Sequence, residues 1–420
     1  MRKAKTIAFA AVALAAASAI LIGGEAASRP GAAALPVAPS TWNPQSAAAH
    51  LDQRVNWWQT WPKSARDHGT VCVSCHTALP YALARPALSG ILHDNEPTPM
   101  ERKLVADVTT RVRSWSDMKP YYGDTTPNGR IKAIESRGTE SVLNALVLAS
   151  RDERSGVVSA EAREAFANMF ALQQTTGEDA GAWQWLNFAL RPWESKTAVY
   201  FGAALAALAI GTEPQNFAQS SEIQPNVERL RTYLREHVDQ SVWRRLLRRD
   251  DPRLFNRAML LWASAKLPSL LSKDEQHSII AALWQAQEPD GAWRLTSLGH
   301  WRAAPSAPSD SAGDGVATGL VAYALERAGS APSEPHLSRA LAWLAQHQDP
   351  ATGMWHASSL NKERNPASNV GKFMSDAATA YAVLALAGAA PLATSRAERS
   401  GLDSTAAAGR LALHHPQLRQ

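Results

Sequence analysis

Apolar residues recur at helical spacing along most of the chain, in Ala- and Leu-rich stretches separated by loops rich in Gly, Pro, Asp and Ser. No stretch between residues 131 and 390 alternates convincingly between apolar and polar positions as a strand would. Upstream, residues 51–61 form a short predicted helix with an aromatic face, and Thr98 with Pro99 begins another that reaches Trp115. The pattern predicts an all-α protein, with further helices over residues 140–149, 160–172, 196–209, 227–237, 273–284, 315–327, 336–346 and 376–387.

A Gln followed by a turn and a Trp recurs within this helical region. The four Trp are separated by 60, 50 and 62 residues, a period that fits a helical hairpin with its loop. Each Gln is expected to bond free carbonyls at a helix end while its amide stacks on the Trp, and a Gly permits the turn. The copies are Gln174 with Trp183, Gln287 with Trp293 and Gln348 with Trp355, and a degenerate copy has Gln240 with Trp243.

The motif Cys72-Val-Ser-Cys75-His76 matches the attachment signature of a c-type haem. Two thiols three residues apart can form thioethers to one porphyrin, and the following His76 would then be the proximal ligand of the iron. The chain has only two cysteines, and both lie in this motif. We therefore expect one covalent haem c, with Met100 as a candidate distal ligand and Met118, His93 and His68 as alternatives. A disulfide, a thioredoxin-like pair or half of a zinc site remain open for the two thiols.

The Gln–Trp repeats resemble those of the squalene–hopene cyclase and prenyltransferase superfamily, over roughly residues 131–390. The resemblance implies an α/α toroid, in which inner and outer helices alternate around a central cavity. The segment from Trp57 to Pro86 looks like the front end of bacterial proteins that pair a haem-attachment motif with such a toroid. We therefore expect a small helical haem-binding segment over residues 49–125, followed by the toroid over residues 131–390.

Acidic residues precede several predicted inner helices, among them Glu194, Asp314 and Asp376, with Asp310 nearby. Asp310, Asp314 and Asp376 are weak catalytic candidates, because a buried acid could protonate a substrate in the cavity. The alternative is that these residues cap helices. The cyclase family uses an Asp-x-Asp-Asp cluster that this chain lacks, so we do not expect protonation-initiated cyclisation.

Charge and the terminal segments limit the partners and the location of the protein. Residues 1–28 have a basic start, an apolar run and small residues at the end, which predicts a signal peptide. The formal net charge of +5 would fall to +3 with removal of Arg2, Lys3, Lys5 and Glu25, too small a bias to predict nucleic acid as a partner. We expect a linker over residues 29–48 and a disordered tail over residues 391–420. The protein is expected to be periplasmic or extracellular, with a membrane anchor only if the signal stays uncleaved.

Three functions follow from these observations. The first is an exported c-type haem protein for electron transfer or redox sensing, with the toroid as a scaffold for a redox partner or a small ligand. The second is a squalene cyclase-like enzyme acting on an apolar or saccharide substrate in the toroid cavity. The third is a binding module without haem, in which Cys72 and Cys75 form a disulfide.

Overall fold

The computed structural model describes residues 42–123, 129–238, 251–301, 307 and 313–389. Contacts divide the chain into residues 1–39 and 40–420, and every described residue belongs to the second unit. The predicted signal peptide and tail lie outside the described residues, as do Asp310 and the repeat copy at Gln240 and Trp243. Within the described part of the chain, no helix has both the length and the apolar character needed to cross a membrane.

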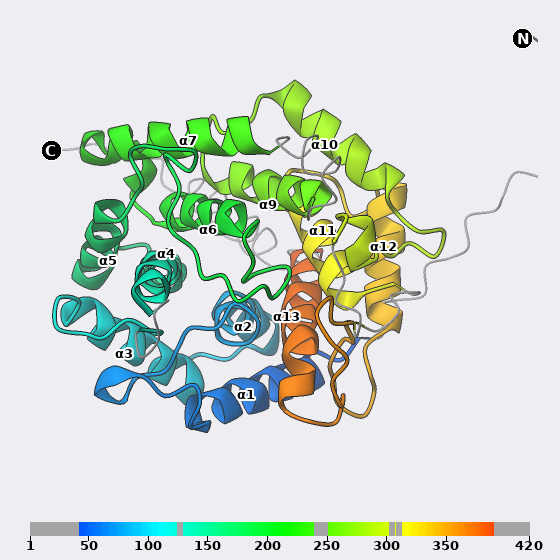
Figure 1. Ribbon diagram of the computed structural model, residues 1–420. Coiled ribbons are helices and arrows are strands. Elements are labelled where there is room, and N and C mark those ends of the chain that lie inside the picture. Colours follow the sequence, from blue (N-terminus) through cyan, green and yellow to red (C-terminus); the bar gives the residue numbers. More distant parts are fainter. Residues whose placement is uncertain (1–41, 124–128, 239–250, 302–306, 308–312, 390–420) are drawn as a thin grey trace, which may run out of the picture. The chain divides into compact units, whose positions relative to one another are not determined.

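The second unit is an α/α toroid, as the sequence predicted (Figure 1). Along the chain an outer helix alternates with an inner one, and the described residues form no strand beyond isolated bridges. The inner helices contact one another in a closed ring, in the order α2 (Ala78–Leu92), α4 (Gly129–Ser155), α6 (Val199–Thr212), α9 (Arg253–Lys266), α11 (Gly315–Arg327) and α13 (Phe373–Gly388), with α13 returning to α2. The outer helices are α1 (Pro44–Thr60), α3 (Pro99–Arg113), α5 (Ala160–Ala171), α7 (Gln224–His237), α10 (Lys273–Gln285) and α12 (Pro335–Gln346).

Residues 49–125 are not a segment set apart from the toroid. They supply α1, α2 and α3, and α2 packs between α13 and α4 as a member of the inner ring. Without α2, the apolar faces of both neighbours would be exposed to water. The ring therefore extends from Pro44 to Gly388, and the end of the predicted linker is helical because Asn43 caps α1 and Pro44 occupies its first turn.

The repeat Trp residues are buried where the repeat predicted. In each described copy the indole Nε1 donates a hydrogen bond to a carbonyl near the end of the preceding outer helix. This contact fixes the turn between an outer helix and the inner helix that follows it. Trp183 bonds Met169 at 2.6 Å, Trp293 bonds Leu283 at 2.8 Å and Trp355 bonds Leu344 at 2.7 Å, and all three Trp are 0% exposed.

The repeat Gln joins one outer helix to the next. Gln287 Nε2 donates to the carbonyl of Gly291 in its own turn and to that of His336 in α12, both at 2.8 Å. The first copy uses Gln173 rather than the predicted Gln174, since it is Gln173 Nε2 that bonds Gly181 and Asn226. A shift of one residue changes the face on which a side chain lies at a helix end, which the sequence spacing alone did not resolve.

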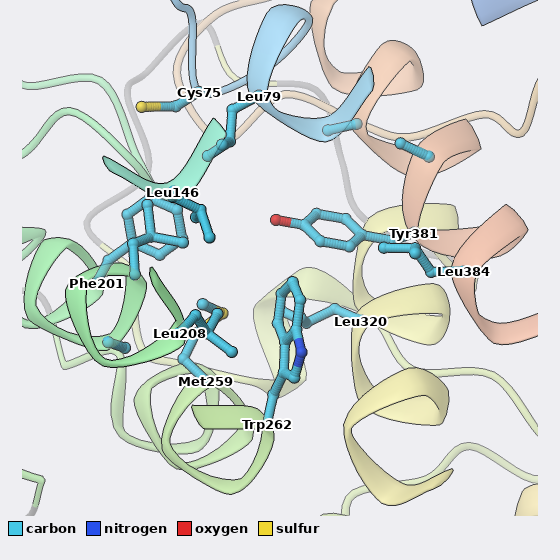
Figure 2. Packing of buried hydrophobic residues seen from close by; sticks show 14 of the residues in the cluster. Cys75, Leu79, Leu146, Phe201, Leu208, Met259, Trp262, Leu320, Tyr381 and Leu384 are labelled. Carbon is cyan, nitrogen blue, oxygen red and sulfur yellow. The ribbon is translucent and has the colours of Figure 1, made fainter. Parts of the chain in front are cut away.

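The centre of the ring is filled by apolar side chains from the inner helices. Figure 2 shows Leu146 of α4, Phe201 of α6, Trp262 of α9, Leu320 of α11 and Tyr381 of α13 directed into one buried cluster. The resemblance had implied a cavity at the axis of the toroid. The structure instead has a cavity where loops precede the inner helices α2, α6 and α13.

The contact between the turn at Gly353 and α1, which closes the ring, gives a prediction about two glycines with left-handed backbone conformations. A Cβ at Gly353 (φ +74°) would overlap the carbonyl of Ser46 in α1, whereas one at Gly329 (φ +96°) would meet nothing within 4 Å. Gly329→Ala should therefore cost about 1–2 kcal/mol from backbone strain alone. Gly353→Ala should cost about 1–3 kcal/mol more, because α1 must also move. Urea unfolding of both variants measures this, and equal losses would contradict the closure contact.

Candidate functional site

A cavity of about 290 Å³ lies where three outer-to-inner loops meet. This volume is near the lower end of the range for small-molecule sites, roughly 300–1,000 Å³. Asn361 ties two of the loops together, accepting a hydrogen bond from Arg191 N and donating one to Arg191 O, both at 2.8 Å. The lining includes His76 before α2, Arg191, Trp193 and Glu194 before α6, Arg364 in the loop before α13, and Phe373 at the start of α13.

Glu194 is a half-buried acid without a described counter-charge. Its backbone forms an isolated bridge with Leu190, which holds the residue at the cavity wall. Among the described residues no hydrogen bond or ion pair engages its carboxyl group. Burial accordingly raises the pKa of Glu194 to about 7, so that the group holds its proton up to near neutral pH.

His76 has a fixed orientation on another wall of the same cavity. Its ring stacks on Phe373 with centroids 3.8 Å apart, and Trp58 meets it edge-on at 5.0 Å. Its Nδ1 lies 2.8 Å from Thr77 Oγ1. Burial lowers the pKa of His76 to about 3, so the imidazole is neutral under ordinary conditions.

Asp376 is the centre of a buried polar network beneath the cavity. Its carboxylate accepts hydrogen bonds from Arg54 Nε at 2.6 Å, from Arg54 Nη2 at 3.0 Å and from Thr77 Oγ1 at 2.6 Å. His50 Nε2 is 3.8 Å away. Burial alone would raise the pKa of Asp376, but the contacts with His50, Arg54 and Thr77 outweigh it and hold that pKa below its usual value. Asp376 is therefore an ionised partner of Arg54 in this arrangement and a poor proton donor.

Asp314 occupies a helix cap, the alternative that the sequence left open. One carboxylate oxygen accepts hydrogen bonds from Val316 N at 2.8 Å and Ala317 N at 3.1 Å, at the start of α11. The other accepts from Ser358 N at 3.0 Å. Asp314 therefore also links α11 to the loop that carries part of the cavity wall.

Of the predicted haem ligands, His76 lines the cavity, whereas Cys72, Cys75 and Met100 do not. Cys72 and Cys75 are free thiols, 5% and 3% exposed, and Cys75 belongs to the buried cluster (Figure 2). Burial raises the pKa of Cys72 to about 12 and that of Cys75 well above its ordinary value. Neither thiol lines the cavity that His76 lines, and Met100, in the first turn of α3, does not line it either. The alternative disulfide between Cys72 and Cys75 is not formed.

No protein-family model and no curated protein matches the sequence. Among solved structures, the fold is similar to a possible member of the GH105 family from Salmonella enterica, with 14% identity, a TM-score of 0.45, and coverage of 82% of this chain and 94% of that chain. It is also similar to a structure named as a glycosidase variant, with 12% identity, a TM-score of 0.44, and coverage of 81% and 97%. Neither likeness is close enough to carry an activity to this chain.

Electron transfer or redox sensing through a haem was the main function expected, and that prediction is wrong. The described residues hold no group of three or more His, Cys, Asp and Glu side chains that could bind a metal ion. Neither thiol lines the cavity at His76. The covalent haem c itself stays a prediction of the motif.

The unpartnered acid gives a prediction about stability. Between pH 4.5, the ordinary pKa of Glu, and about 7, the unfolded chain loses the Glu194 proton while the folded chain keeps it. The free energy of unfolding that this group contributes therefore falls as pH rises through this window. The melting temperature of Glu194→Gln, relative to the parent, should rise from pH 4.5 to pH 8. Glu222→Gln, at an exposed site, should show no such trend, and a flat difference for Glu194→Gln would contradict the raised pKa.

Proposed function

We propose that this protein is an enzyme that hydrolyses a small, negatively charged saccharide bound in the cavity at the loop end of the toroid, with Glu194 as general acid. The observation that carries the proposal is the carboxyl group of Glu194. It lines the cavity, has no described counter-charge, and has a pKa raised by burial to about 7. A general acid works best when its pKa lies near the working pH, because it is then both protonated and able to give up its proton.

The chemistry asked of Glu194 is a single proton transfer. As the bond between the sugar carbon and the leaving oxygen breaks, the Glu194 carboxyl donates its proton to that oxygen. Water supplies the hydroxyl group to the carbon, and its remaining proton restores the overall balance once Glu194 is reprotonated. Asp376 cannot take this role, because Arg54 and Thr77 stabilise its ionised form.

The remaining lining supports a polar substrate with an apolar face. Trp193 and Phe373 supply aromatic surface, while Ser358, Ser359 and Asn361 supply hydrogen-bonding groups. This combination of flat apolar walls and a few polar groups is typical of small-molecule sites, and it suits a sugar ring.

The charged groups of the lining favour an anion. Arg191, Lys362 and Arg364 are cationic, against Glu363 and Glu194, whose pKa of about 7 leaves it only partly ionised at neutral pH. Arg364 is held at the wall by a 3.2 Å hydrogen bond from its Nη1 to Val370 O, with its guanidinium 5.7 Å from the Phe373 ring centroid. A carboxylate or sulfate group on the sugar could bind the Arg364 guanidinium without a rearrangement of that side chain.

The test is hydrolysis of a panel of neutral, carboxylated and sulfated oligosaccharides by the purified protein. The parent should cleave an anionic member, with kcat/KM falling above about pH 7 as Glu194 loses its proton. Glu194→Gln should reduce kcat/KM by about 10²–10⁴-fold, the usual contribution of a general acid, and remove that limb of the profile. Glu222→Gln, the same change at an exposed site, should behave as the parent.

Two results would overturn the proposal. One is full activity in Glu194→Gln, which would show that the acid lies elsewhere. The other is the absence of cleavage across the whole panel. If the parent prefers neutral sugars and Arg364→Gln keeps this preference, the proposal that the substrate is negatively charged is wrong, while the role of Glu194 as general acid stands.

A further inference from the structure

We infer that His76 is locked in the tautomer that carries its proton on Nδ1, and that its bare Nε2 accepts a hydrogen bond from an O–H group of the substrate or of the attacking water. Thr77 and Asp376 are the positioning residues that set this tautomer. The inference deepens the proposed function and rests on it for the identity of the O–H group. The state of the imidazole can be measured without any substrate, in the protein without haem, because the predicted haem would use His76 as an iron ligand.

The proton on Nδ1 follows from counting donors along the network. The Asp376 carboxylate can only accept, and its contacts with Arg54 keep it ionised. Thr77 Oγ1 lies 2.6 Å from Asp376 Oδ2 and must donate its single hydrogen there. The same oxygen lies 2.8 Å from His76 Nδ1 and has only lone pairs left to offer. His76 Nδ1 must therefore be the donor, and Nε2 of the neutral ring is left with a free lone pair.

The lone pair on Nε2 is available to a ligand. No described residue forms a hydrogen bond with Nε2, and this atom is not among the buried polar atoms that lack a partner. His76 itself lines the cavity that contains Glu194. One wall thus carries an acid that holds its proton, and another carries an acceptor that cannot donate from its exposed nitrogen. A hydroxyl group between them has a defined direction of hydrogen bonding.

The network is built to keep this orientation. Arg54 comes from α1, Thr77 from the loop before α2 and Asp376 from α13, so three parts of the ring must be in place together. Arg54 Nη1 also donates to Asn369 Oδ1 at 2.8 Å, which fixes the guanidinium. Stacking on Phe373 fixes the plane of the imidazole. Residues locked by such surrounding contacts give a site its precision.

The direct test is ¹⁵N NMR of the His-labelled protein at pH 7, with the His76 signals identified by their loss in His76→Gln. The parent should show a protonated Nδ1 and an unprotonated Nε2. Thr77→Ser keeps the hydroxyl group and should keep this pattern. Thr77→Val removes the hydroxyl group at nearly constant shape and should shift the ring toward a mixture of tautomers, with a thermal melt confirming that the variant folds.

Asp376→Asn offers a sharper outcome. If the Asn oxygen keeps the 2.6 Å bond to Arg54 Nε, its NH₂ group replaces Oδ2, loses the hydrogen bond from Arg54 Nη2 and donates to Thr77 Oγ1. The Thr77 hydroxyl is then free to donate to Nδ1, and the His76 proton should move to Nε2. An Nε2–H tautomer in the parent, or an unchanged pattern in Thr77→Val, would overturn the inference.

Activity separates this inference from the proposed function. On a cleaved substrate, Thr77→Val should lower kcat at least tenfold and Thr77→Ser should restore it. If the parent cleaves nothing while the tautomer behaves as expected, the proposed function fails and the positioning network stands. If cleavage depends on Glu194 but is untouched by Thr77→Val, the role of His76 fails and the proposed function stands.

Discussion

The hydrogen bonds between Gln348 and Asn43 close the ring on which the other features depend. Gln348 Nε2 donates to Asn43 O at 2.9 Å, and Asn43 N donates to Gln348 Oε1 at 2.6 Å, across 305 residues of chain. Gln287 joins α10 to α12 by the same kind of contact, so the closure of the ring is another copy of the repeat. Beside this contact α13 packs directly against α2, which brings Asp376 next to Thr77.

The alternation of outer and inner helices also explains where the chemistry gathers. Three loops that lead from an outer to an inner helix, before α2, α6 and α13, come together to form the cavity. Burial acts on all acids there in the same direction, so their partners decide the outcome. Asp376 has Arg54 and Thr77 and is held ionised, whereas Glu194 has no described counter-charge and keeps its proton. This difference is the basis for proposing Glu194 as the proton donor.

Helical periodicity and the Gln–Trp repeat were sufficient to predict the all-α toroid and the burial of Trp183, Trp293 and Trp355, because both depend on local spacing. The sequence predicted a separate segment over residues 49–125, whereas the structure places α1 to α3 within the ring. A short motif does not show that these helices fill a gap between α13 and α4. Glu194 was noted only as one acid among several ahead of helices. What distinguishes it from Asp376 is Arg54, 322 residues from Asp376 in sequence, and no local pattern signals such a partner.

The most direct test of this account is a pH titration of the Glu194 carboxyl carbon by ¹³C NMR, with the signal assigned by its loss in Glu194→Gln. Two other half-buried or buried acids, Glu213 and Glu326, have pKa values raised by burial to about 8, so the assignment is essential. The account predicts a midpoint near pH 7 for Glu194. A midpoint near 4.5, the ordinary value for Glu, would mean that the carboxyl is ionised at neutral pH and would contradict its role as the proton donor.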